Sequence, residues 1–329
     1  MKTAFRIAAA LLAAGLLPAS AARDLQLDET VRKEFPAAAG GRLELDTDTG
    51  PIRVLGTNGS QVVVEVTRRL RVSGARAEQA LRDHEVAFTE SGGTISMRAR
   101  RGGAARRWGR SELKVEVRAW VPAQFNVNAH TSGGEVVVEN VAGEITASTS
   151  GGPVALADVS GKVVGRTSGG SIRGRKLAGE VMLDTSGGGI SVQQFSGAKL
   201  DVRTSGGSIS LKDVTGAVSA RTSGGGIEIE AAAGPVEARS SGGSVRVTLN
   251  SAPTGPLTLG TSGGSVTVEL PADAAFSLAA GTSAGGVNSD FPVKLSGSAG
   301  SRSASGEING GGPLVALKSS GGTIHIRKR

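Results

Sequence analysis

Hydrophobic and polar residues alternate in short blocks along the middle of the chain. In residues 204–221, Ile209 and Leu211 alternate with polar neighbours, and Val218 and Ala220 repeat the alternation after a Thr-Gly pair. A hydrophobic period of two residues is typical of a β-strand that buries one face. Each block therefore predicts two short strands separated by a turn.

Each block opens with Thr-Ser-Gly-Gly or a close variant. The copies start at Thr131, Thr149, Thr167, Thr185, Thr204, Thr222, Ser240 and Thr261, and weaker copies start at Thr282 and Ser319. Most steps between copies are 18 residues, and a fixed period near twenty residues is typical of a solenoid. One block buries too little apolar surface to fold alone, so the blocks must stack and share a core. We predict an all-β protein, a parallel β-solenoid (β-helix) with rungs of about 18 residues, and we expect its coil to be right-handed.

The paired glycines of the opening motif are predicted to form its turn, because glycine adopts positive φ at no steric cost. These structural glycines are Gly133, Gly134, Gly151, Gly152, Gly169, Gly170, Gly187, Gly188, Gly206, Gly207, Gly224, Gly225, Gly242, Gly243, Gly263 and Gly264.

The N-terminus has the layout of a secretory signal peptide. Two basic residues, Lys2 and Arg6, precede an apolar run over residues 7–17 and a group of small residues that ends at Ala22. The apolar run is too short to span a bilayer comfortably, so we expect residues 1–22 to be removed on export. No later stretch is apolar enough to span a membrane, and the mature chain is expected in the periplasm or on the cell surface of a bacterium.

The mature chain divides into three parts. Residues 23–130 are predicted to be irregular and strand-rich, with one short helix from Ser73 to His84. Residues 131–281 form the regular shaft, and residues 282–329 hold degenerate rungs and a C-terminal cap. The basic residues 327–329 are expected at the exposed final edge, where charge deters edge-to-edge pairing.

Composition narrows the chemistry. The chain has 51 glycines, no cysteine, 3% aromatic residues and a net charge of +8. The lack of cysteine excludes disulfides and thiolate metal sites. The scarcity of aromatic residues argues against the stacking platforms that sugar-processing enzymes use.

A basic cluster near residue 100 is the main candidate binding site. Its members are Arg98, Arg100, Arg101, Arg106, Arg107 and Arg110, with Trp108 among them. Guanidinium groups bind phosphate and carboxylate in pairs of hydrogen bonds, so this stretch predicts an anion-binding loop. The alternative is a solvated loop between two strands. For an exported protein we expect an anionic polysaccharide, lipopolysaccharide or another envelope protein as partner, and no nucleic acid.

No catalytic, cofactor or metal site is predicted. Ser262 lies in a segment that resembles the nucleophile segment of trypsin-like proteases, but the same turn recurs along the chain. Short matches to Ser-x-x-Lys, in which Ser111 precedes Lys114 and Ser196 precedes Lys199, lack companion motifs. The three histidines, His84, His130 and His325, have no metal-ligand spacing, and Asp46 and Asp48 lack the calcium-repeat pattern.

The Thr-Ser-Gly-Gly repeats, the signal peptide, and the segments 41–45 and 50–54 resemble the bacterial putative-adhesin family. The resemblance covers about residues 40–329. It implies an exported β-solenoid, and it supplies no catalytic or ligand residue. The expected function is a non-enzymatic, monomeric envelope protein, an adhesin or scaffold that binds anionic polymers. The alternatives are a carbohydrate-active lyase or hydrolase on a β-helix and a self-assembling filament subunit.

Overall fold

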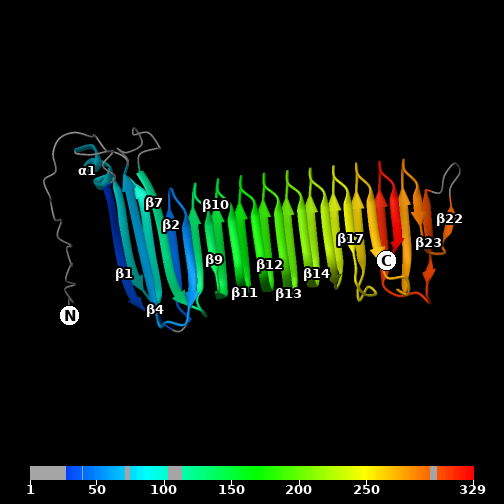
Figure 1. Cartoon of the computed structure of the whole chain (residues 1–329), viewed down its shortest axis with the longest axis horizontal. Coiled ribbons are helices and arrows are strands. Elements are labelled where there is room, and N and C mark those ends of the chain that lie inside the picture. The colour runs from blue at the N-terminus through cyan, green and yellow to red at the C-terminus, as the bar shows by residue number, and fades with distance from the viewer. Residues whose placement is uncertain (1–26, 39, 71–74, 103–112, 297–301) are drawn as a thin grey trace, which may run out of the picture.

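The protein is an elongated β-solenoid in which the strands stack side by side along one axis, and the described residues contain one short helix, near the N-terminal end of the stack (Figure 1). The structure is a computed structural model, and it describes residues 27–38, 40–70, 75–102, 113–296 and 302–329. The predicted all-β parallel solenoid is confirmed.

A regular rung consists of two strand segments joined by a corner. The strand β12 (Ile172–Thr185) covers a whole rung and pairs in parallel with β13 (Ile190–Thr204). We call the strands that follow the Thr-Ser-Gly-Gly turn face A, and the strands that lead into the next turn face B.

Face A stacks, in spatial order, β1 (Leu27–Pro36), β4 (Gln61–Leu70), β7 (Leu113–Pro122), β3 (Ile52–Thr57), β9 (Val136–Glu139), the first halves of β11 (Val154–Thr167), β12, β13 and β14 (Ile209–Thr222), β15 (Ile227–Ala233), β17 (Val245–Thr248), β19 (Val266–Leu270), β25 (Ile324–Lys328) and β21 (Val287–Ser289). The pairs β1–β4 and β4–β7 are antiparallel, and the others are parallel.

Face B stacks β5 (His84–Ser91), β6 (Thr94–Arg101), β2 (Arg42–Thr47), β8 (Asn126–Thr131), β10 (Ala142–Thr149), the second halves of β11 to β14, β16 (Val236–Ser240), β18 (Leu257–Thr261), β24 (Leu314–Ser319), β20 (Phe276–Thr282), β23 (Ser303–Ile308) and β22 (Lys294–Ser296). The pairs β5–β6, β20–β23 and β22–β23 are antiparallel. The helix α1 (Ala75–Arg82) precedes β5, as the sequence predicted; Ser73 lies outside the described residues.

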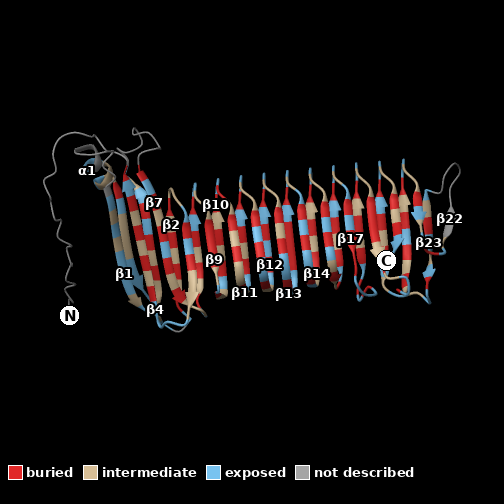
Figure 2. Cartoon of the chain, viewed as in Figure 1, coloured by how far each residue is buried: buried red, intermediate tan, exposed pale blue. Residues whose placement is uncertain are grey.

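One continuous apolar core fills the space between the two faces. Burial alternates along most strands of the shaft (Figure 2), and the equivalent side chains of neighbouring rungs, such as Ile172, Ile190 and Ile209, are each at most 1% exposed. β-Branched residues dominate these columns because they pack well on a pleated surface. The hydrophobic pattern of the sequence therefore reports the core directly.

The chain order departs from the stacking order at both ends. The rung of β2 and β3 lies between strands that come later in the sequence, β6 and β7 on one side and β8 and β9 on the other. At the other end, β24 and β25 lie inside the stack, and β20 to β23 lie beyond them. The expectation that residues 327–329 cover an exposed final edge is wrong, because β25 pairs on both sides.

The paired glycines do not work as the sequence analysis proposed. Neither Gly151 nor Gly152 lies in the left-handed region of φ. The second glycine of the turn is required by close stacking instead, since a Cβ added at Gly152 would lie 2.1 Å from the carbonyl oxygen of Gly134 in the rung before. A Cβ at Gly151 would meet nothing nearer than 3.8 Å. Positive φ occurs in the other turn, at Gly179 for example (φ +100°).

The corner of each rung carries a second backbone constraint. Non-glycine residues adopt positive φ at this position: Asn140, Asp158, Lys176, Gln194, Asp213 and Ala231. Left-handed backbone costs an ordinary L-residue about 1–2 kcal/mol. Asn and Asp tolerate it best, so alanine is poorly suited to the corner at residue 231.

Replacing Ala231 by glycine is expected to raise the free energy of unfolding by about 0.5–1 kcal/mol, because φ is +53° there and glycine removes the steric cost. The matched control is Ala233→Gly, two residues away in β15 and without positive φ, which is expected to destabilise by about 0.5–1 kcal/mol. Urea unfolding of both variants checks the prediction, and it is wrong if both changes act in the same direction.

Candidate polyanion-binding groove

The hydroxyl groups of the repeated motif hold the rungs together. In the turn that follows β12, Thr185 Oγ1 donates to the carbonyl oxygen of Gly170 at 2.8 Å and accepts from the amide of Gly188 at 3.4 Å. The same pair of bonds recurs at Thr131, Thr149, Thr167, Thr204, Thr222, Ser240, Thr261, Thr282 and Ser319. Most of these residues are buried. The motif is therefore structural, and its repetition needs no catalytic explanation.

One serine does contact a histidine, but without the third partner of a triad. His130 Nδ1 and Ser148 Oγ are 2.9 Å apart on the outer surface of face B. Asp46 is the register partner of His130 on the other side, yet its carboxylate is taken by an ion pair with Arg100. In the described part of the chain, no carboxylate bonds to the imidazole of His130 to orient it, as a Ser-His-Asp triad requires.

The outer surface of face B carries a column of basic side chains near the C-terminal end. Arg203, Arg221 and Arg239 occupy the same position on successive rungs. Arg203 pairs with Asp201 at 2.9 Å, whereas Arg221 and Arg239 share Glu237 at 2.7 and 3.0 Å. Three guanidinium groups therefore face two carboxylates, and the column keeps a positive excess.

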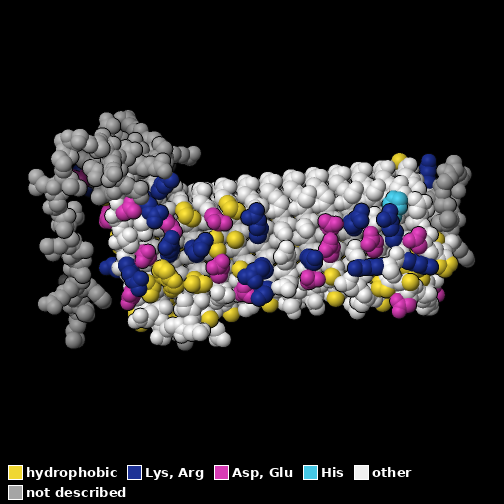
Figure 3. Space-filling view, viewed as in Figure 1, with side chains coloured by type: hydrophobic (Ala, Val, Ile, Leu, Met, Phe, Trp, Pro, Cys, Tyr) yellow, Lys and Arg dark blue, Asp and Glu magenta, His cyan; other side chains and the backbone are white. Residues whose placement is uncertain are grey.

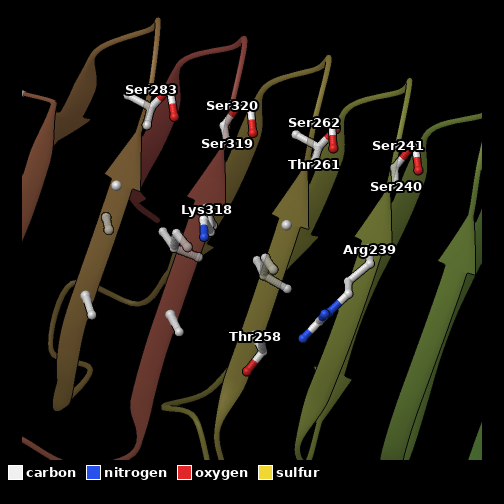
Figure 4. Close-up of a pocket in the computed structure, with 18 of the residues that line it drawn as sticks. Arg239, Ser240, Ser241, Thr258, Thr261, Ser262, Ser283, Lys318, Ser319 and Ser320 are labelled. Carbon is white, nitrogen blue, oxygen red and sulfur yellow. The ribbon is translucent and has the colours of Figure 1, made fainter.

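The column then changes from arginine to small residues, and the surface becomes hollow. The next positions are Gly260, Lys318 and Gly281, and the groove they share with the arginines has a volume of about 1350 Å³ (Figure 4). Ala279 and Ala316 also line it, so the side chains on both sides of Lys318 are small and leave the space open. One side of the groove is lined by the exposed turn serines Ser241, Ser262, Ser283 and Ser320 (Figure 4).

Two cations in this groove have no acidic partner. Within the described ranges, neither Lys318 nor Arg302 forms an ion pair. Residues 297–301, which precede Arg302 in the sequence, include no acidic residue. On the face in Figure 3, basic and acidic side chains lie beside one another in several places, and two such pairs there are Lys212 with Glu230 and Arg246 with Glu269. The groove therefore holds an excess of positive charge, because its arginine column has three guanidinium groups for two carboxylates and Lys318 and Arg302 add two more cations.

The basic cluster that the sequence singled out is only partly seen. Arg98 and Arg100 are exposed on β6, and Arg101 is half-buried with its amide bonded to Asp48 at 3.1 Å. The hydrogen bond that Arg100 donates to the Asp46 carboxylate raises the pKa of Arg100, so this guanidinium is already paired. Arg106, Arg107, Trp108 and Arg110 lie outside the described residues. The anion-binding role of this cluster stays a prediction.

In the sequence, Arg203, Arg221 and Arg239 recur at the same position of successive repeats, which places them on one face, but the repeats do not indicate the rest of the groove. Lys318 and Arg302 are far from Arg239 in the sequence, and only the inserted position of β24 brings Lys318 next to Gly260. The replacement of arginine by glycine at residues 260 and 281 is the sequence feature that could have indicated the groove. It marks the rungs at which the arginine column of face B has no side chain.

A buried polar cluster fixes the N-terminal end of the solenoid. Arg68 donates to the carbonyl oxygens of His84 at 2.6 Å and Leu81 at 3.1 Å, and to Glu29 at 2.7 Å. His84 is 1% exposed, and its Nε2 lies 3.9 Å from Asp48. Neither ring nitrogen has a hydrogen-bond partner in the described part of the chain. Burial lowers the pKa of His84 to about 4 against the opposing charge of Asp48.

Acid is expected to loosen this end of the protein. The pKa of His84 is lower in the folded state than the 6.5 of an unfolded chain, so its contribution to stability is complete above pH 6.5 and is lost as the pH falls towards 4. Between pH 7.5 and 4.5 we expect a loss of about 2.5 kcal/mol. Urea unfolding of the protein and of His84→Leu at both pH values measures it, and equal losses in the two proteins would contradict this assignment.

Fold and surface together define a parallel β-solenoid with a basic groove on one face. The family model described as Toastrack DUF4097 matches residues 41–327. The chain therefore belongs to the Toastrack DUF4097 family, in agreement with the resemblance seen in the sequence. No curated protein matches it. In the described ranges, no helix is long and apolar enough to cross a bilayer.

Several solved structures resemble the chain over most of its length. One, described as a putative lipid binding protein from Parabacteroides distasonis, is 12% identical over 91% of this chain and 97% of that one, with a TM-score of 0.41. A putative adhesin from Bacteroides fragilis is 14% identical over 91% and 97%, with a TM-score of 0.37. A putative cell adhesion protein from Clostridium sporogenes is 13% identical over 92% and 100%, with a TM-score of 0.23.

Proposed function

We propose that this protein is an exported, non-catalytic binding protein of the bacterial cell envelope, and that its groove on face B holds an anionic polymer. The observation that supports it is the charge of the groove. Arg203, Arg221, Arg239, Lys318 and Arg302 line it. Among the described residues, Asp201 and Glu237 are the only acidic residues that form ion pairs with members of this set.

The shape of the groove favours a linear ligand. The basic positions follow the solenoid axis, with neighbouring rungs about 4.8 Å apart, so charges are presented in a row. Guanidinium groups bind carboxylate and phosphate through paired hydrogen bonds, and the exposed hydroxyls of Ser241, Ser262 and Ser320 on the wall suit a hydroxylated chain. An acidic polysaccharide combines both features.

Binding is tested by titrating the protein with alginate oligosaccharides, which carry a carboxylate on every sugar, and with neutral dextran of equal length. We expect binding to alginate that weakens as salt is added, because exposed charges are screened within about 10 Å at 0.1 M salt, and no binding to dextran. A phosphate-bearing glycan in the same assay distinguishes carboxylate from phosphate recognition. Equal binding to alginate and dextran, or none to any anionic polymer, would refute the proposal.

Location is tested separately with an epitope tag between Ser251 and Ala252, both exposed in the connection before β18. An insertion at an exposed loop spares the fold. We expect antibody to reach the tag on intact cells if the protein works at the surface, and only after permeabilisation if it works in the periplasm. A tag found in the cytoplasm would contradict export.

A further inference from the structure

The last rung of the chain occupies a slot between two rungs that precede it in sequence. On face B, β24 lies between β18 and β20, and on face A, β25 lies between β19 and β21. Figure 1 shows these red strands inside the orange ones. The final 16 residues can therefore enter only after the two flanking rungs are separated.

The two flanking rungs carry matching surfaces. Ser319 Oγ donates to the carbonyl oxygen of Gly264 at 2.9 Å, and Thr282 Oγ1 donates to that of Gly322 at 2.8 Å. Thr282 stands at the same position of its rung as Ser319, so it can take the Gly264 carbonyl when the slot is empty. The two flanking rungs can therefore pack directly on each other when the last rung is absent, and they can separate to accept it. In both states a hydroxyl group of the repeated motif donates to the Gly264 carbonyl.

The inserted rung is joined to the rest by a short glycine-rich hinge. Asn309, Gly310, Gly311 and Gly312 all adopt positive φ, and Pro313 follows them. Glycine crosses this region of φ freely, so the hinge can change direction at little steric cost. In the observed conformation of the hinge, the side-chain amide of Asn309 donates to the carbonyl oxygen of Ala274 at 2.9 Å.

The two rungs that border the slot contact the C-terminal end of β25. The amide of Lys328 donates to Asp290 at 3.1 Å, and the amide of Arg329 donates to the carbonyl oxygen of Leu270 at 2.8 Å. Lys328 Nζ also lies 5.2 Å from the centre of the Phe291 ring. These partners belong to the two flanking rungs, so the same contacts form whichever copy of the chain supplies the segment.

We propose that residues 314–329 exchange between two copies of this protein, so that the last rung of each chain fills the slot of the other. Every contact of the rung is kept, and only the path of the hinge changes, which is the condition for domain swapping. The balance depends on the concentration of a second copy against the effective concentration of the chain's own segment, which is of millimolar order for a short linker. At low protein concentration the protein is monomeric, and at high concentration residues 314–329 are exchanged between copies.

The exchange also affects the groove. Lys318 belongs to β24, so in the exchanged dimer each groove contains the lysine of the partner copy. The ligand site would then be completed across two molecules. This consequence rests on the proposed function, whereas the exchange itself does not.

Cysteine pairs test the exchange directly, because the chain has no cysteine of its own. Thr258 and Ala316 are register partners on β18 and β24, and adjacent strands lie within the distance that a disulfide spans. Thr258→Cys and Ala316→Cys are made in separate full-length chains of different mass. The two chains are unfolded, mixed, refolded and oxidised together.

We expect a disulfide-linked heterodimer in about a third of the chains after refolding near 1 mM, and in less than about a tenth near 10 μM. The control is the mixed pair Ser219→Cys and Glu237→Cys, which are register partners inside the regular shaft and are expected to give no heterodimer. The double variant with both groove cysteines in one chain should form an internal disulfide, which shows that the geometry allows the bond.

Two outcomes would overturn the proposal. One is an internal disulfide in the double variant but no heterodimer from the mixed chains at either concentration. The other is equal heterodimer in the shaft control. Deleting residues 310–312 gives a second test, since a shortened hinge favours exchange, and dimer should then appear at about tenfold lower protein concentration by light scattering. A dimer fraction that does not respond to the hinge would also refute it.

Discussion

Replacing Gly152 by alanine is expected to lower the free energy of unfolding by about 3 kcal/mol. The new Cβ would lie 2.1 Å from the carbonyl oxygen of Gly134 and 2.4 Å from its carbonyl carbon. Both atoms belong to the backbone of the neighbouring rung and cannot rotate away. The rungs must therefore separate locally, which weakens the hydroxyl bond from Thr149 to Gly134 at 2.8 Å. Urea unfolding followed by circular dichroism measures the loss.

The adjacent glycine supplies the control for this prediction. Gly151→Ala places a Cβ no closer than 3.8 Å to any atom outside its neighbours, at an exposed position without left-handed φ. We expect a change within about 0.5 kcal/mol of zero. If the two substitutions destabilise equally, the turn requires the conformational freedom of glycine. Close stacking of Gly152 on Gly134 is then not the reason for the second glycine.

The fold was predictable because its main determinant is a local pattern repeated many times. The alternation of Ile209 and Leu211 with polar residues recurs in each rung, and parallel stacking with equivalent residues in register follows from it. The role of the glycine pair was not predictable in the same way. In the sequence, a glycine required for its φ cannot be distinguished from one required by contact with the next rung. The structure distinguishes them, because the backbone of Gly134 in the neighbouring rung lies against Gly152.

The order of the rungs at the two ends was also hidden from the sequence. A rung that starts at Thr282 and one that starts at Ser319 carry the same motif, so either can stack on the rung of Thr261. The structure places the later one next to it. The candidate site depends on this choice, since Lys318 enters the groove with that rung. The local sequence pattern therefore predicts the structure of each rung, whereas the connections between rungs determine which rungs are neighbours in the stack.

The second large effect is expected in ligand binding. The double variant Lys318→Glu with Arg302→Glu should weaken alginate binding by about 100-fold or more, or about 2.8 kcal/mol. Each residue contributes a hydrogen-bonding cation, and such a bond is worth about 1.5–3 kcal/mol. Both side chains lack acidic partners in the described residues, so their replacement breaks no ion pair of the fold. Stability should change little, which thermal unfolding checks.

A double variant with the same change in net charge on face A distinguishes binding of alginate in the groove from attraction of alginate by the net charge of the protein. Arg173→Glu with Lys212→Glu changes the net charge by the same amount on face A, and it is expected to weaken alginate binding by less than about threefold, because exposed charges on the opposite side are largely screened at physiological salt. Calorimetric titration of both double variants at two salt concentrations makes the comparison. If the two lose affinity equally, the polymer is attracted by net charge alone. If neither loses affinity but Arg98→Glu with Arg100→Glu does, the binding site is the N-terminal cluster and the groove is not used.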